Sequence, residues 1–72
     1  MTYGEKAVGL DFNPSGDEDV RKVKDMFAEL IDFCDVARDQ AKDSEKKRLF
    51  SIAITECQAA QMWVVKAITW ND

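Results

Sequence analysis

The chain has 72 residues and a net charge of −4, enough for one small domain that buries only about 60% of its unfolded surface. A domain of this size needs a cross-link such as a disulfide, or assembly with other chains, to be stable. The acidic balance argues against general binding to duplex nucleic acid, which needs a broad basic face, but it allows a small anionic ligand held by a few aimed cations and backbone N–H groups.

The sequence lacks the residue patterns of metal binding and nucleophilic catalysis. It contains no histidine, and Cys34 and Cys57 do not have the CxxC spacing of a zinc site. No base is therefore at hand to activate either cysteine, and no triad, nucleophile elbow or glycine-rich phosphate loop is recognisable. We expect no enzyme activity, cofactor or metal, and we interpret both cysteines as small buried hydrophobic residues.

Residues 1–14 are expected to form an arm and a turn. The arm shows no sustained hydrophobic period, so we expect it to be extended or partly helical. Asn13 marks a boundary, because a residue before proline is pushed towards extended geometry. Ser15, followed three residues later by Glu18, matches a capping box. We therefore place the first long helix at about 15–42.

The apolar residues of this first helix recur at the spacing of one face. Lys24 lies inside that apolar stripe, four residues after Val20 and three before Phe27. One interpretation is that its methylene stem follows the core edge while the ammonium reaches water. The other is that the ammonium faces an anionic ligand. Lys22 lies on another face and is expected to be solvated.

The stretch from Leu49 to Trp70 is apolar on every side, with Glu56 and Lys66 as its only charges. With Ser44 as a cap, it predicts a second helix over about 45–70. One partner helix covers only one side of such a helix, so it is expected to be buried in an assembly or a membrane. Its polar residues, Glu56 and Lys66 included, make membrane insertion expensive, which favours an assembly.

The predicted fold is therefore all-α. We expect a single domain over 1–72, formed by a two-helix antiparallel hairpin with a short N-terminal arm and assembled as a homo-oligomer, with no membrane segment.

The candidate binding residues gather at the start of the first long helix. The ring of Phe12 can stack on a base, the carboxamide of Asn13 can read a base edge, and the ammonium of Lys24 can pair with a phosphate. The alternative for Phe12 is a hydrophobic staple against the helix. Near the C-terminus, Lys66 either pairs with an acidic residue of a neighbouring chain or lines a second anion site, with Thr69 nearby.

Several of these segments together resemble one protein family. The run Lys6-Ala7-Val8-Gly9, the turn Phe12-Asn13-Pro14-Ser15, the helix with Lys24 and the ending from Ala60 to Trp70 resemble the small phage anti-CBASS cyclic-nucleotide sponges. These proteins share a helical-hairpin domain with the phage anti-Thoeris sponges. The FNPS turn and the KA-x-TW ending are the most specific parts of the resemblance, which spans nearly the whole chain.

The resemblance implies a compact homohexamer in the cytoplasm of the infected bacterium. Such a protein binds cyclic dinucleotides such as 3′,3′-cGAMP, and in some members cyclic trinucleotides, and sequesters them without cleavage. The signal then does not reach the effector of the CBASS defence.

The resemblance also implies site residues. The dinucleotide pocket of the family uses an aromatic ring, an amide side chain and a lysine, and the matching positions are Phe12, Asn13 and Lys24. Lys22 is the alternative for the lysine, and Tyr3 from the arm is the alternative for the ring. Lys66 and Thr69 are weaker candidates for a trinucleotide site.

Two other functions compete with the sponge. The first is a non-catalytic helical module whose apolar second helix docks on another protein, and the second is a small structural subunit without a ligand.

Overall fold

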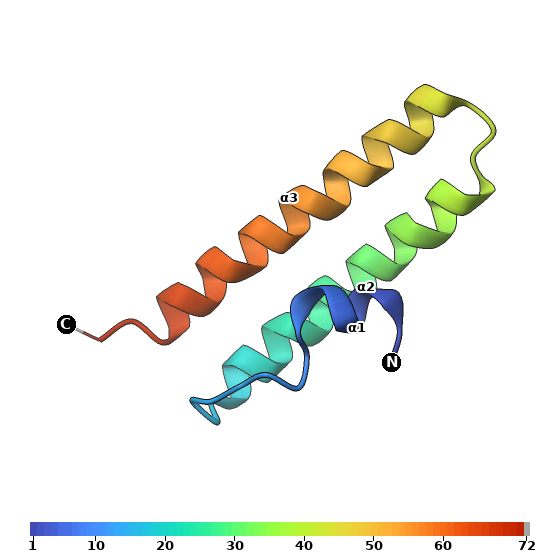
Figure 1. The fold of residues 1–72 in the computed structure, drawn as a ribbon. Coiled ribbons are helices and arrows are strands. Elements are labelled where there is room, and N and C mark those ends of the chain that lie inside the picture. The colour runs from blue at the N-terminus through green and yellow to red at the C-terminus, as the bar shows by residue number, and fades with distance from the viewer. Residues whose placement is uncertain (72) are drawn as a thin grey trace.

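The computed structural model describes residues 1–71, and these form three helices and no strand. They are α1 (Tyr3–Val8), α2 (Glu18–Gln40) and α3 (Ser44–Ile68). Figure 1 shows α2 and α3 as a long antiparallel hairpin, with α1 lying against the first half of α2. The prediction of an all-helical hairpin is confirmed, and the arm is the part of the chain that supplies α1.

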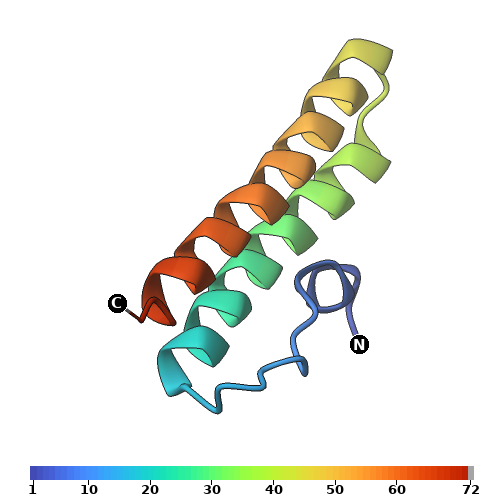
Figure 2. The same cartoon turned by 60° about the vertical axis from the view of Figure 1, so that its left-hand side comes forward.

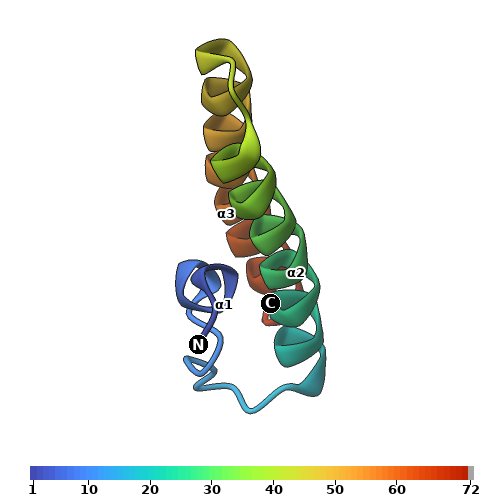
Figure 3. The same cartoon turned by 90° about the vertical axis from the view of Figure 1, so that its right-hand side faces the viewer.

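The short helix α1 exists because both of its ends are capped. Thr2 and Glu5 form a capping box, in which the Thr2 hydroxyl accepts from the Glu5 N–H and the Glu5 carboxylate accepts from the Thr2 N–H. Gly9 ends the helix in the left-handed conformation, at a φ of 62°, which glycine adopts without steric cost. Figures 2 and 3 show α1 packed beside the hairpin, where it makes most of its contacts with α2.

The start of α2 corrects one prediction. Asp17, not Ser15, caps the helix, and its carboxylate accepts from the Asp19 N–H at 2.7 Å. Gly16, at a φ of 67°, turns the chain between Ser15 and the helix, so the Ser15 hydroxyl instead accepts from the Asp17 N–H. A carboxylate at this position also interacts favourably with the positive end of the helix dipole.

The hairpin connection corrects a second cap. Asp43 caps α3 by accepting from the Glu45 N–H at 2.8 Å, and Ser44 is the first residue of the helix. Thus α2 and α3 are joined by a short loop, and α3 ends at Ile68.

A narrow core joins the three helices. Ile31, at its centre, is fully buried, and Cys34 is buried beside it, as interpreted from the sequence. Cys57 packs against this core but is only half-buried; both cysteines are free, and burial raises the pKa of the Cys57 thiol. The core cluster consists of Val8, Leu10, Ala28, Ile31, Cys34 and Ile54.

Both long helices leave large apolar side chains exposed. Met26 and Phe33 project from α2, and Met62 and Trp63 project from α3, with Trp63 68% exposed. The apolar second helix expected from the sequence is therefore covered on one side only within a single chain. Within residues 1–71, no helix combines the length and the hydropathy needed to cross a membrane.

The contact of α1 with α2 predicts the effect of one small substitution. A β-carbon at Gly4 would overlap the backbone carbonyl of Ala28, and the Gly4 N–H also donates to the Asp32 carboxylate at 2.6 Å. We expect Gly4→Ala to lower the free energy of unfolding by about 1–3 kcal/mol, because the helix backbone of α2 cannot move aside. Urea denaturation followed by circular dichroism measures this change.

Lys6→Ala is the matched control, because Lys6 is an exposed residue of the same short helix. Its effect should stay within about 0.5 kcal/mol. Equal stability of Gly4→Ala and the parent protein would contradict the close packing of α1 on α2.

Candidate functional site

The ammonium of Lys24 fastens the turn to α2. Lys24 is only 5% exposed, and its Nζ donates to the carbonyl oxygens of Gly9, at 2.9 Å, and of Phe12. The same ammonium lies 5.6 Å from the centre of the Phe12 ring. The interpretation in which this ammonium reaches water is therefore wrong, since the side chain turns towards the backbone of the turn.

Within residues 1–71, this buried cation has no opposite charge beside it. No carboxylate among the described residues lies within ion-pair distance of the Lys24 ammonium. A lysine ammonium has three N–H donors, of which the two carbonyls engage two. Burying a charge is costly unless it is paired. The turn thus holds a positive charge that an anion would compensate.

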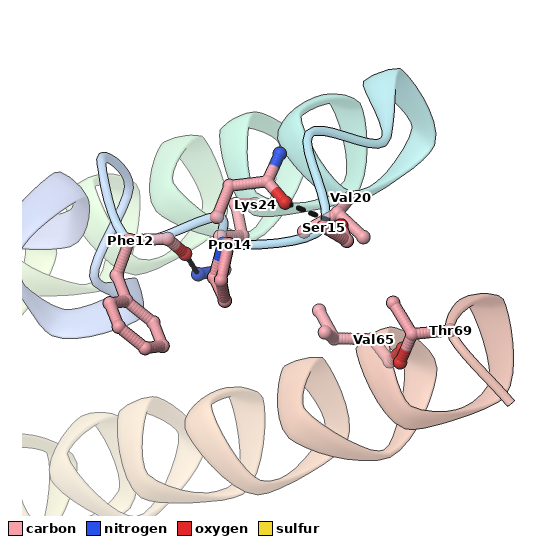
Figure 4. Close-up of a pocket in the computed structure, with 8 residues that line it drawn as sticks. Phe12, Pro14, Ser15, Val20, Lys24, Val65 and Thr69 are labelled. Atoms are coloured by element: carbon pink, nitrogen blue, oxygen red, sulfur yellow. Dashed lines mark hydrogen bonds between the residues drawn. The ribbon is translucent and has the colours of Figure 1, made fainter.

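A hollow of about 240 Å³ lies beside this ammonium, between the turn and the last turns of α3. Figure 4 shows Phe12, Pro14 and Val20 on one side of it, with Val65 and Thr69 directed towards them from α3. We call it the turn hollow; its lining residues are Phe12, Asn13, Pro14, Ser15, Val20, Lys24, Val65 and Thr69. The structure therefore brings together four of the predicted site residues.

A second hollow of about 480 Å³ adjoins the first on the side of α1. The two share Phe12, Lys24 and Val65, and the second extends over Gly9 and Gln61. We call it the α1 hollow, and the two together the groove. Pockets for small ligands usually measure about 300–1,000 Å³, so the α1 hollow is of that size and the turn hollow extends it.

The ring of Phe12 is a free surface at the junction of the two hollows. It is 72% exposed, so the staple predicted as an alternative is wrong. Because Asp17 caps α2, Phe12 also lies too far upstream to occupy the staple position directly before the cap. An exposed ring over a cation is suited to stacking on a flat aromatic ligand.

Asn13 is used inside the turn. Its Nδ2 donates to the Asp17 carbonyl at 3.0 Å, and its Oδ1 accepts from the Ser15 hydroxyl at 2.7 Å. Both ends of the carboxamide are therefore occupied. Asn13 shapes the turn hollow, and one N–H of its amide is left for a ligand.

Tyr3 lies away from the groove. Its ring is 5.7 Å from the guanidinium of Arg38, which also donates to the Asp35 carboxylate and the Ser51 hydroxyl. Asp35 and Tyr3 raise the pKa of Arg38. At about 1.5 Å of rise per residue, Arg38 lies about 21 Å further along α2 than Lys24. Within one chain, Tyr3 does not take the place of Phe12.

Lys66 and Thr69 separate in the structure. The Lys66 ammonium lies 5.3 Å from the Trp63 ring centre and 5.9 Å from that of Trp70. It lines a different hollow, of about 280 Å³, with Ala59, Met62 and Trp63. Thr69 instead lines the turn hollow, and its hydroxyl donates to the Val65 carbonyl at 2.8 Å.

Gln61 is the residue that the sequence interpretation missed. It is 5% exposed and lines the α1 hollow together with Phe12 and Lys24. From the sequence it counted as one of the polar residues that make membrane insertion costly and as part of the ending that carries the resemblance, but not as a site residue. The signal in the sequence was its position in an apolar helix, because glutamine is mostly exposed in proteins and a buried one is unusual.

Comparison with known proteins identifies the family. No curated protein and no solved structure matches the chain. A family model described as the Acb2/Tad1 hairpin domain matches residues 5–69, from α1 through α3. This match confirms the resemblance to the anti-CBASS and anti-Thoeris sponges. The chain belongs to the Acb2/Tad1 hairpin-domain family.

Proposed function

We propose that this protein sequesters cyclic dinucleotide signals of the bacterial CBASS defence, such as 3′,3′-cGAMP, and holds them without cleavage. The family supplies the general role of a sponge for signalling molecules. The observation that carries the ligand class is the buried Lys24 ammonium, which has no carboxylate partner among the described residues and lies under the exposed ring of Phe12.

The groove offers one group for each part of such a ligand. A phosphate would compensate the charge of Lys24 and accept its third N–H, as a charge-assisted hydrogen bond. A base would stack on Phe12, which is 72% exposed. The remaining N–H of Asn13 would donate to a further oxygen or ring nitrogen. A cyclic dinucleotide carries two phosphates and two bases, so it presents these groups twice.

We further propose that the protein works as a homohexamer in the cytoplasm of the infected bacterium. The exposed side chains of Met62 and Trp63 on α3, and of Met26 and Phe33 on α2, support assembly because exposed apolar surface of this kind is usually covered by a partner. A symmetric assembly repeats each groove and places equivalent grooves against the two halves of one ligand.

A second ligand class, cyclic trinucleotides, is proposed for the hollow at Lys66. Its ammonium, beside the rings of Trp63 and Trp70, combines positive charge with aromatic surface at a place distinct from Lys24. Thr69 lines the turn hollow, so we assign it to the dinucleotide groove instead.

Retention of an intact ligand tests the proposed function directly. The purified protein is mixed with 3′,3′-cGAMP, freed of unbound nucleotide and then denatured by heat. We expect chromatography of the supernatant to recover intact 3′,3′-cGAMP. Recovery of linear dinucleotide would show an enzyme, and the absence of retained nucleotide would overturn the proposal.

Replacement of Lys24 tests the contact that carries the ligand class. Lys24→Met keeps most of the stem and removes the ammonium, which leaves the carbonyls of Gly9 and Phe12 without their donor. We expect affinity for 3′,3′-cGAMP to fall at least about tenfold, since hydrogen bonds to charged groups contribute about 1.5–3 kcal/mol. Isothermal titration calorimetry measures the affinity, and thermal melting reports the accompanying loss of stability.

Lys22→Met is the matched control, because Lys22 is an exposed lysine on the same helix. It should leave both affinity and melting temperature unchanged. Normal binding by Lys24→Met, or weakened binding by Lys22→Met, would place the phosphate contact elsewhere.

The mass in solution discriminates the sponge from a helical module that binds other proteins. The exposed apolar side chains of α3 also fit that alternative. For the sponge we expect light scattering to give six times the chain mass of 8.2 kDa. A monomer with this helix exposed would favour the protein-binding module.

A further inference from the structure

The helix α2 carries a second apolar stripe, on the side that the hairpin does not cover. Its inner side, with Ala28 and Ile31, belongs to the buried core. On its other side Met26 and Phe33 are exposed to solvent. We call the second stripe the outer stripe; it consists of Val23, Met26, Leu30, Phe33 and Ala37.

The spacing of the outer stripe is that of a coiled-coil seam. Its members follow one another after three, four, three and four residues, from Val23 to Ala37. An apolar residue at every 3.5 positions on average keeps one line of side chains facing a second helix. A helix that is apolar on two sides is covered on both in a stable protein. The outer stripe therefore indicates a helical partner in addition to α3.

The surface of the outer stripe has the shape of one half of a coiled-coil contact. A hollow of about 200 Å³ lies on it, lined by Val23, Met26, Phe27 and Leu30. These residues stand at positions i, i+3, i+4 and i+7 of the helix. Four residues of one helix form the hole that receives an apolar side chain of the facing helix. The outer stripe thus has both a hole and exposed side chains that can fill one, as a contact between two equal surfaces requires.

The charges at the two ends of the outer stripe favour an antiparallel pair of α2 helices. Asp19 stands one turn before Val23, and Lys42 comes just after the end of α2. Both are exposed, and within the described chain neither forms an ion pair. An antiparallel pair that crosses at Leu30, the middle of the stripe, places Asp19 of each copy opposite the Lys42 end of the other. A parallel pair would instead place the two Asp19 carboxylates side by side.

We infer that the outer stripe docks on the outer stripe of a second copy of this chain, with the two α2 helices antiparallel. The inference rests on the proposed function, because it names a contact surface of the homohexamer proposed there. No residue of the outer stripe lines the turn hollow or the α1 hollow. The contact between copies and the binding of a ligand are therefore tested separately.

A charge on the outer stripe tests the contact. Phe33 is exposed in the single chain, so Phe33→Glu should fold, but the pair would have to bury an unpaired carboxylate. We expect light scattering to give at most half the mass of the parent assembly, with an unchanged circular dichroism spectrum. Val36→Glu is the matched control, because Val36 is an exposed apolar residue of α2 outside the stripe. It should keep the mass of the parent.

A measurement on the unaltered protein covers the case in which Phe33→Glu does not fold. Labelled and unlabelled chains are assembled together, and isotope-filtered NMR then detects contacts between chains alone. We expect contacts from the methyl groups of Val23 in one chain to the Phe33 ring or the Ala37 methyl group of another. Val23 and Phe33 lie about 15 Å apart along one helix, so a parallel pair would not give these contacts. Their absence from an assembled parent protein would overturn the inference.

The remaining outcomes separate this inference from the proposed function. Full parent mass in a folded Phe33→Glu, or an equal loss of mass in Val36→Glu, would overturn the docking surface. Retention of 3′,3′-cGAMP by the parent would then leave the sponge intact. A parent mass of 8.2 kDa, that of one chain, would overturn both the docking surface and the homohexamer. An assembled parent that passes both tests of the stripe but retains no nucleotide would keep the docking surface and overturn the sponge.

Discussion

The hydrogen bonds of the Lys24 ammonium are the interaction on which the site depends. They connect the end of α1, at Gly9, and the turn, at Phe12, to the first half of α2. The segment between α1 and α2 has no regular structure. Asn13 and Ser15 hold its downstream part to the start of α2, and the bonds of Lys24 hold its upstream part. The same ammonium closes one wall of the groove and gives it positive charge. Lys24 therefore contributes to both the position and the charge of the site.

The fold followed from the sequence because the two long helices carry strong signals. The helical spacing of apolar residues from Val20 to Cys34 and the apolar run after Leu49 each extend over more residues than a strand usually has. Both segments therefore indicate helices. Helix caps were harder to predict. Ser15 and Asp17 are both good caps, and the choice depended on the left-handed backbone of Gly16, which sequence spacing does not reveal. The arm was expected to be extended or partly helical, and no helix bounds were predicted there, although the capping box of Thr2 and Glu5 marks the start of α1.

The candidate site was predictable in part, for a physical reason. Lys24 stood out because a cation in an apolar stripe is an anomaly that can be seen without coordinates. What it bonds to could not be seen, since Gly9 and Phe12 approach it only after the chain turns back. Tyr3 separated from the groove because α1 carries its own first residue towards Arg38. The place of Gln61 in the groove could not be predicted, because the hollow that it lines forms only when α1 and the turn pack beside α3.

The packing of Gly4 against α2 couples the groove to the folding of the chain. A helix of six residues does not persist alone in water, so the wall that α1 gives to the groove exists only while α1 is docked. Any molecule that binds against this wall shifts the equilibrium between docked and detached α1, and its binding free energy adds to the stability of the folded state. At a free concentration 1,000 times the dissociation constant, that addition is about 4.1 kcal/mol. The filled protein would therefore resist proteases better than the empty one, and its lifetime in the cell would rise with the amount of signal that it holds.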